Sequence, residues 1–68
     1  MRAVVLRHGE DGYWVAEVPS LPGCVSQGKT KAEAIDNIRE AIDGWVEAAK
    51  ANGLAVPNED FDTQVVCV

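Results

Sequence analysis

The stretch "EVPSLPGCVSQGKTKAEA", residues 17–34, joins an apolar run to the start of a predicted helix, and it decides the fold. Pro19 cannot donate a backbone hydrogen bond to a neighbouring strand, so it marks a strand end. In residues 21–24, Leu-Pro-Gly-Cys, the proline presets φ and the glycine supplies the positive φ of a type II turn. The chain then returns through "CVSQG" as a short strand that ends at Gly28. We interpret this stretch as a turn that holds two strands in register.

Two chemical interpretations of the same stretch are weaker. A phosphate-binding loop needs glycines that lead directly into helical N–H groups, and Gly28 stands alone. A catalytic thiolate at Cys24 needs a nearby imidazole or helix N-terminus. The single imidazole, His8, is predicted at the far end of the first strand. Cys24 is therefore expected to be a small buried side chain, with a disulfide to Cys67 as the alternative.

Downstream of this stretch the sequence predicts one long helix over residues 31–52. Thr30 and Glu33 fit a capping box, in which each side chain accepts a hydrogen bond from the backbone N–H of the other. Gly53 stands where a left-handed residue ends a helix, and Leu54 follows as its apolar contact. Apolar residues recur at steps of three and four and form one stripe: Ala34, Ile35, Ile38, Ala41, Ile42, Trp45 and Ala49.

Upstream, residues 2–8 and 13–18 are apolar and β-branched and flank the turn cluster "GEDG", so they predict a β-hairpin. Alternation places Trp14, Ala16 and Val18 on one side, with Tyr13, Val15 and Glu17 on the wetter side. Residues 55–62 are a linker, and "TQVVCV" at residues 63–68 predicts a fourth strand. We predict a single α+β domain spanning residues 1–68, a two-layer β-β-β-α-β sandwich with one helix on a four-stranded sheet.

Composition limits the partners of the chain. It has 68 residues and a formal net charge of −5, so phosphate backbones are repelled and no direct nucleic-acid binding is expected. Such a surface favours a basic partner. A core this small is marginal, which predicts a homo-oligomer, dimer or tetramer. Two cysteines and one histidine give no zinc site, and we expect no metal or cofactor. The absence of a long apolar run predicts a cytoplasmic protein without a membrane segment.

Acidic and aromatic side chains are the candidates for contact with a partner. The helix acids Asp36, Glu40, Asp43 and Glu47 share one face, which is either a solvated surface or a site for a cation-rich partner. Tyr13, on the Glu17 side of its strand, is a candidate anchor, whereas Trp45 on the apolar stripe is expected in the core.

The order and spacing of these motifs over residues 12–53 resemble the HicB family of antitoxins. That family's run is an aromatic strand, Pro-x-Leu-Pro-Gly-Cys, a Gly-x-Thr helix start, Glu-Ala and a long amphipathic helix. The matching residues here are Pro19, Leu21, Pro22, Gly23, Cys24, Gly28, Thr30, Glu33 and Ala34.

The resemblance implies a fold like a reduced RNase H fold. It further implies a bacterial or archaeal cytoplasmic protein that neutralises a small basic HicA-type mRNA-cleaving toxin by masking its active site. Many members carry a C-terminal DNA-binding domain. Because this chain ends at Val68, directly after the predicted fourth strand, DNA binding is not expected. The first strand also lacks the acidic residue that holds magnesium in RNase H-like nucleases, so we expect no enzyme activity.

We hypothesise that the toxin contacts lie on the hairpin, the following turn and the helix acids. The predicted partner-binding residues are Tyr13, Glu17, Leu21, Pro22, Asp36, Glu40, Asp43 and Glu47. The rival interpretation is a small binding or scaffold module that uses the same fold to self-assemble without a toxin.

Overall fold

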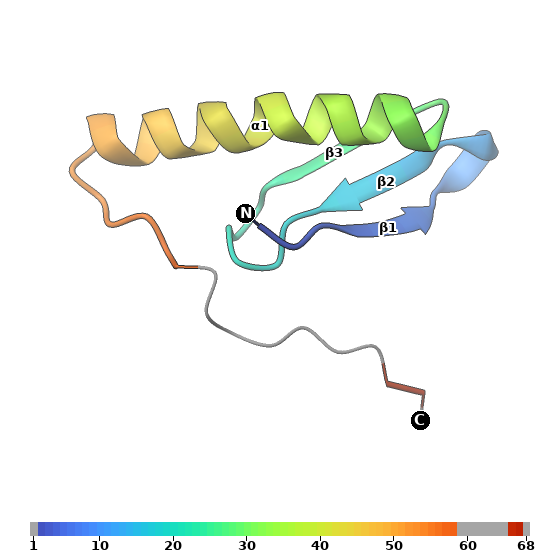
Figure 1. Cartoon of the computed structure of the whole chain (residues 1–68), viewed down its shortest axis with the longest axis horizontal. Helices are drawn as coiled ribbons and strands as arrows, with labels where there is room; N and C mark the ends of the chain where they lie inside the picture. The colour runs from blue at the N-terminus through green and yellow to red at the C-terminus, as the bar shows by residue number, and fades with distance from the viewer. Residues whose placement is uncertain (1, 59–65, 68) are drawn as a thin grey trace.

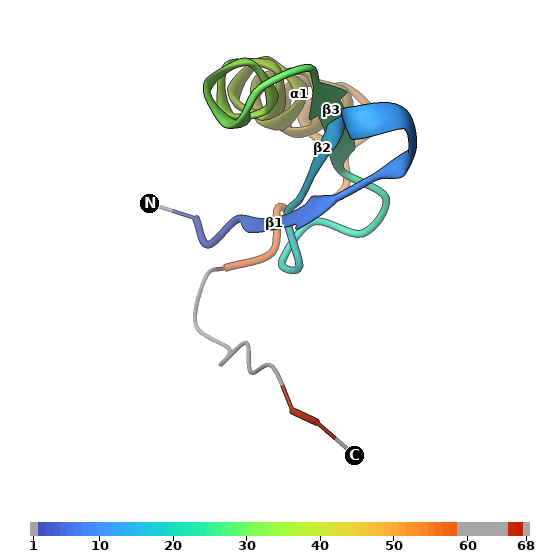
Figure 2. The same ribbon diagram turned by 90° about the vertical axis from the view of Figure 1, so that its right-hand side faces the viewer.

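The computed structural model describes residues 2–58 and 66–67 and is an α+β structure with one helix laid across a three-stranded sheet (Figure 1). Strand β1 (Val5–His8) leads through the short 3-10 turn η1 (Glu10–Gly12) into β2 (Trp14–Glu17). Strand β3 (Val25–Gly28) then precedes helix α1 (Lys31–Ala51). The predicted two-layer arrangement, with sheet below and helix above, is confirmed, and Figure 2 shows the layers end-on.

The sheet is antiparallel in the order β1-β2-β3. Leu6 pairs with Ala16 in the β1–β2 ladder, and Ala16 pairs with Ser26 in the β2–β3 ladder. The predicted fourth strand falls on residues 63–68, of which 63–65 and 68 lie outside the described residues. Val66 and Cys67 are described, belong to no strand and are exposed. The described sheet therefore has three strands.

The turn between β2 and β3 has the predicted features. The Cys24 N–H donates to the Leu21 carbonyl oxygen at 3.0 Å, which closes the turn, and Gly23 has a φ of 78°. The Val18 N–H donates to the Cys24 carbonyl oxygen at 3.0 Å. This bond extends the β2–β3 pairing past the strand ends and fixes the register.

Helix α1 ends one residue before the predicted boundary. At its start the Glu33 N–H donates to Thr30 Oγ1 at 3.1 Å, as predicted. The reciprocal bond differs, because Glu33 Oε1 accepts from the N–H of Lys29 at 3.2 Å rather than from that of Thr30. The carboxylate therefore reaches one residue further back than in a standard capping box.

The end of α1 is closed by two backbone bonds. The Leu54 N–H donates to the Ala49 carbonyl at 2.8 Å, and the Gly53 N–H donates to the Lys50 carbonyl at 3.1 Å. Gly53 has a φ of 68°. Together these features form a Schellman motif. The predicted left-handed glycine is confirmed, although the Leu54 side chain remains 63% exposed.

Replacing Thr30 with alanine should lower the free energy of unfolding by about 1 kcal/mol, because the Glu33 N–H loses its acceptor at the helix start. Urea unfolding followed by far-UV circular dichroism measures the change. The variant Thr30→Ser keeps an oxygen at the same position and should retain most of the wild-type stability. Equal losses in both variants would contradict the capping role.

The core lies between α1 and the strands β2 and β3, which are the strands that α1 contacts most. As alternation predicted, Ala16 and Val18 are buried, and Trp14 packs half-buried against them. The helix contributes Ala34 and Ile38, which are 0% and 1% exposed. Because α1 lies over β2 and β3, the side of the helix that faces β1 is less fully covered by the sheet.

Candidate functional site

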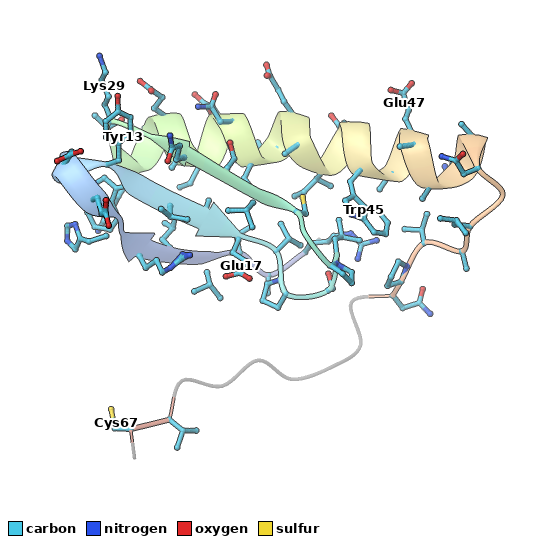
Figure 3. The ribbon with its side chains drawn as sticks, turned by 180° about the vertical axis from the view of Figure 1, so that it is seen from behind. Tyr13, Glu17, Lys29, Trp45, Glu47 and Cys67 are labelled. Carbon is cyan, nitrogen blue, oxygen red and sulfur yellow. The ribbon has the colours of Figure 1, made fainter. Side chains whose placement is uncertain are left out.

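The helix acids share the outer face of α1. Asp36, Glu40, Asp43 and Glu47 are all exposed, because they are about half a helical turn away from the buried stripe. In Figure 3, Glu47 points away from the sheet, whereas Trp45 points toward it. The outer face of α1 therefore presents four carboxylates to a partner.

The hairpin candidates belong to the other layer. Tyr13 is half-buried just before β2, and Glu17 is exposed at the end of β2. Alternation places Glu17 on the sheet face opposite buried Ala16, away from the helix, as Figure 3 shows. Val25, which pairs with Glu17 in the β2–β3 ladder, is 48% exposed. This open sheet face carries both a charge and an exposed apolar side chain.

The turn residues Leu21 and Pro22 have different environments. Pro22 is exposed, but Leu21 is 0% exposed and is among the largest fully buried side chains. A side chain enclosed by its own core cannot contact a partner without unfolding, so Leu21 is removed from the candidate surface. Its apolar character reflects a position inside the core rather than on the outside of the turn.

Two side-chain bonds that sequence reasoning missed join α1 to the sheet and its turn. Trp45 Nε1 donates to the Pro22 carbonyl oxygen at 3.0 Å, and Asn37 Nδ2 donates to the Gln27 carbonyl oxygen at 2.8 Å. Trp45 is half-buried against the core, as expected. The positions of the Asn37 amide and the Trp45 indole at the border of an apolar stripe indicate that each could donate such a bond. They do not identify the acceptor, because it lies in a distant segment of the chain.

The predicted residues do not form one patch. The acids of α1 lie on the outer helix face, Glu17 lies on the open sheet face, and Pro22 lies at the turn. The two layers separate the first two groups, so a single rigid partner cannot cover both on one copy of the chain. The outer face of α1 brings together four of the predicted carboxylates and is the stronger candidate.

Cys24 and Cys67 are both free thiols, so the alternative of a disulfide between them is not observed. Cys24 is 3% exposed. Burial raises the pKa of the Cys24 thiol above its ordinary value, and the positive charge of Arg2 partly offsets the shift. A raised pKa keeps the thiol protonated, which disfavours the thiolate that nucleophilic catalysis needs.

His8 contacts an aromatic ring rather than a cysteine. Its ring lies 4.0 Å from that of Trp14, centroid to centroid, and the Nζ of Lys31 lies 4.8 Å from the centroid of the same indole. This stack brings the end of β1, the start of β2 and the start of α1 together. The imidazole therefore contributes to a structural contact at the hairpin end.

Other chemistry receives no support from the described part of the chain. Within residues 2–58 and 66–67, no three His, Cys, Asp or Glu side chains gather as a metal would require. Over the same ranges, no helix is long and apolar enough to span a membrane.

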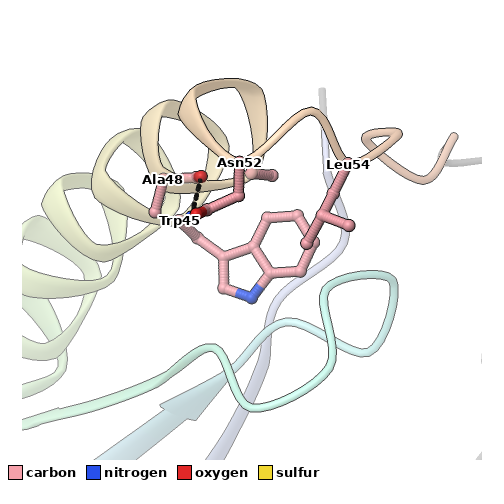
Figure 4. Close-up of a pocket in the computed structure, with 5 residues that line it drawn as sticks. Trp45, Ala48, Asn52 and Leu54 are labelled. Atoms are coloured by element: carbon pink, nitrogen blue, oxygen red, sulfur yellow. Dashed lines mark hydrogen bonds between the residues drawn. The ribbon is translucent and has the colours of Figure 1, made fainter.

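Two hollows flank the helix. One, of about 240 Å³, lies at the end of α1 and is lined by Trp45, Ala48, Ala49, Asn52 and Leu54 (Figure 4). The other is a groove of about 400 Å³ between β1 and α1. Both are mainly apolar, and neither joins a nucleophile to a base. Sequence reasoning predicted neither of them, because each forms between elements whose relative placement it did not specify.

A chemical reagent should distinguish the two thiols. With a disulfide reagent at pH 8, Cys67 should react promptly and Cys24 only after urea is added, because burial both shields Cys24 and keeps it protonated. The absorbance of the released chromophore gives the number of thiols that have reacted. Because burial raises the pKa of Cys24 in the folded state, the unfolded chain loses this proton at a lower pH than the folded chain does. The free energy of unfolding should therefore fall as the pH rises above 9.0, the ordinary pKa of this thiol. Prompt reaction of both thiols in the folded protein would contradict this assignment.

The described fold is a small α+β structure whose helix presents a row of carboxylates on its outer face. Comparison with known proteins identifies the family. The HicB-like antitoxins of bacterial toxin–antitoxin systems match residues 3–65, and the chain belongs to this family.

Relatives of similar length come from archaea and a cyanobacterium. UPF0150 protein Ta0767 of Thermoplasma acidophilum is 47% identical over 59 residues, 87% of this chain and 86% of the relative. A UPF0150 protein of Archaeoglobus fulgidus is 46% identical over 71% of this chain and 70% of its own length. UPF0150 protein ssr1765 of Synechocystis is 47% identical over 85% of this chain and 73% of its own length. No solved structure gave a significant match.

Proposed function

We propose that the chain is an antitoxin that binds a small basic HicA-type mRNA-cleaving toxin and masks its active site. Membership of the antitoxin family supports the general role. The observation that carries the choice of surface is the row of four exposed carboxylates on the outer face of α1. In this role the chain acts by competitive masking in the cytoplasm and performs no catalysis.

Electrostatics favours this surface over the others. A net charge of −5 attracts a basic protein at long range and raises the rate of encounter. The side chains of the α1 row project from a rigid helix, so they are already placed when the partner arrives. Glu17, Tyr13 and Pro22 remain secondary candidates, because the open sheet face is turned away from this row.

The direct test combines binding with rescue from toxicity. Neutralising the row with Asp36→Asn, Glu40→Gln, Asp43→Asn and Glu47→Gln should weaken toxin binding about tenfold, since exposed charges contribute roughly 0.3–0.5 kcal/mol each. Calorimetry measures the Kd, and co-expression measures growth in the presence of the toxin. The weakening should be smaller at high salt, where these charges are already screened.

A matched pair of variants separates local contact from overall charge. Asp43→Asn with Glu47→Gln removes two charges from α1, and Glu10→Gln with Asp11→Asn removes two from the hairpin turn. Asn tolerates the positive φ of Asp11, 56°. Only the α1 pair should weaken binding by more than about twofold. Equal weakening would reject the α1 surface, and failure of the unmodified chain to bind the toxin would reject the function.

A further inference from the structure

Helix α1 ends at the dipeptide Asn52-Gly53, a sequence prone to spontaneous loss of the asparagine amide. Glycine has no side chain to keep its backbone nitrogen away from the preceding side chain. Of the three asparagines in the chain, Asn52 alone precedes a glycine. Asn52 is exposed, and a Cβ built on Gly53 would meet no atom within 4 Å. The surroundings therefore leave room for a ring to form between these two residues.

The loss of the amide uses the backbone as the nucleophile. The Gly53 nitrogen gives its proton to hydroxide and bonds to Cγ of Asn52, the bond from Cγ to the side-chain nitrogen breaks, and ammonia leaves with a proton from water. Water then opens the cyclic imide at one of its two carbonyl carbons. The product at position 52 is an aspartate or an isoaspartate, and water and hydroxide are the only other reactants.

In the folded chain, hydrogen bonds hold both reacting groups. Asn52 Nδ2 donates to the Ala48 carbonyl oxygen at 2.8 Å (Figure 4), and the Gly53 N–H donates to the Lys50 carbonyl oxygen at 3.1 Å. The Gly53 nitrogen must leave its bond before it can lose its proton and attack. The Asn52 side chain must also leave its own acceptor to turn toward that nitrogen. The reaction therefore requires the last turn of α1 to open.

We propose that Asn52 is a site of spontaneous deamidation, that opening of the last turn of α1 sets its rate, and that the product weakens this turn. Helix ends open more readily than buried segments. An aspartate at position 52 lacks the donor to the Ala48 carbonyl and adds negative charge where the helix dipole disfavours it. An isoaspartate adds a backbone carbon inside the Schellman motif, between the Ala49 carbonyl and the Leu54 N–H that it accepts from. This inference concerns the covalent stability of the chain and does not depend on a toxin.

The first experiment follows the amide by mass. After incubation at mildly alkaline pH, digestion and mass spectrometry should show that Asn52 gains the mass difference between an amide and a carboxyl group. Asn37 and Asn58 precede Ile38 and Glu59 and serve as internal controls with much smaller gains. Guanidinium chloride opens the turn in every molecule, so it should raise the rate at Asn52 by about tenfold or more. An unmodified Asn52, or equal rates in the folded and unfolded chains, would overturn the proposal.

A matched pair of variants distinguishes local opening of the last turn from unfolding of the whole chain. Ala51 and Ala32 are exposed residues near opposite ends of α1, and glycine weakens a helix at either position. Ala51→Gly should raise the rate at Asn52 about threefold, because it loosens the turn that holds the reacting groups. Ala32→Gly should leave the rate unchanged. Equal acceleration in both variants would make global unfolding the route and reject the proposal, as would an unchanged rate in Ala51→Gly.

The effect of the product on the turn is tested with a variant that carries it from the start. Asn52→Asp should have a lower urea midpoint than Asn52→Ala, which removes the amide donor without adding a charge. The difference should shrink at high salt, which screens the added carboxylate. Equal midpoints at low salt would refute the claim that deamidation to aspartate weakens the end of α1.

Discussion

Replacing Leu21 with alanine is expected to lower the free energy of unfolding by about 3 kcal/mol and to unfold a large fraction of the protein near room temperature. The Leu21 side chain is fully buried, so its truncation removes apolar contacts and leaves a cavity. A domain of this size has a total stability of only about 3–5 kcal/mol from its core. Urea unfolding monitored by circular dichroism measures the loss.

The control for Leu21 is the exposed leucine of the same chain. Leu54→Ala truncates a side chain that is 63% exposed and should change the free energy of unfolding by less than about 0.5 kcal/mol. A similar small effect at Leu21 would mean that the turn is not an integral part of the core. It would also reopen Leu21 as a contact for a partner.

The second large effect is expected at Gly28, where β3 approaches the start of α1. A Cβ built on Gly28 would lie 2.5 Å from the Ala34 backbone nitrogen and 2.8 Å from the Glu33 carbonyl carbon. These are backbone atoms of the first helical turn, so either the strand end or the helix start must shift. Gly28→Ala should therefore destabilise the protein by about 1–3 kcal/mol, the usual cost of overpacking.

Gly44 provides the matched control for Gly28. It lies within α1, and a Cβ there meets nothing within 4 Å. Gly44→Ala should stabilise the protein by roughly 0.5–1 kcal/mol, because alanine favours the helix. If the urea midpoint falls for Gly28→Ala and rises for Gly44→Ala, the same chemical change has opposite effects at the two positions. That result would establish the close approach of β3 to α1 at Gly28 as the cause. If Gly28→Ala matched the wild type in stability, the close packing of strand and helix would be wrong.

Local patterns predicted the elements of the fold well. Proline and glycine at residues 22–23 specified the turn, and the alternation around Ala16 identified the buried side of β2. Thr30 and Gly53 gave the two ends of α1 to within a residue. Each of these features depends on backbone conformations or periodicities confined to a few neighbouring positions, so the sequence contains the whole signal.

Contacts between distant segments were harder to predict. The hydrogen bond from Trp45 to the Pro22 carbonyl joins residues 23 positions apart, and no local pattern names the acceptor. Leu21 was named as a partner contact together with the rest of its turn, whereas here the turn folds its leucine inward. The groove beside β1 depends on where the helix lies across the sheet. The fourth strand is not confirmed: Val66 and Cys67 belong to no strand, and the rest of the predicted range lies outside the described residues.

The positions of Trp14 and Trp45 supply two built-in optical probes. Trp14 stacks on His8 beside the start of α1, and Trp45 contacts the β2–β3 turn beneath the other end of the helix. Fluorescence from each indole therefore reports on a different end of the molecule. Coincident transitions from both would show that the domain melts as one cooperative unit, and separate transitions would reveal fraying from one end.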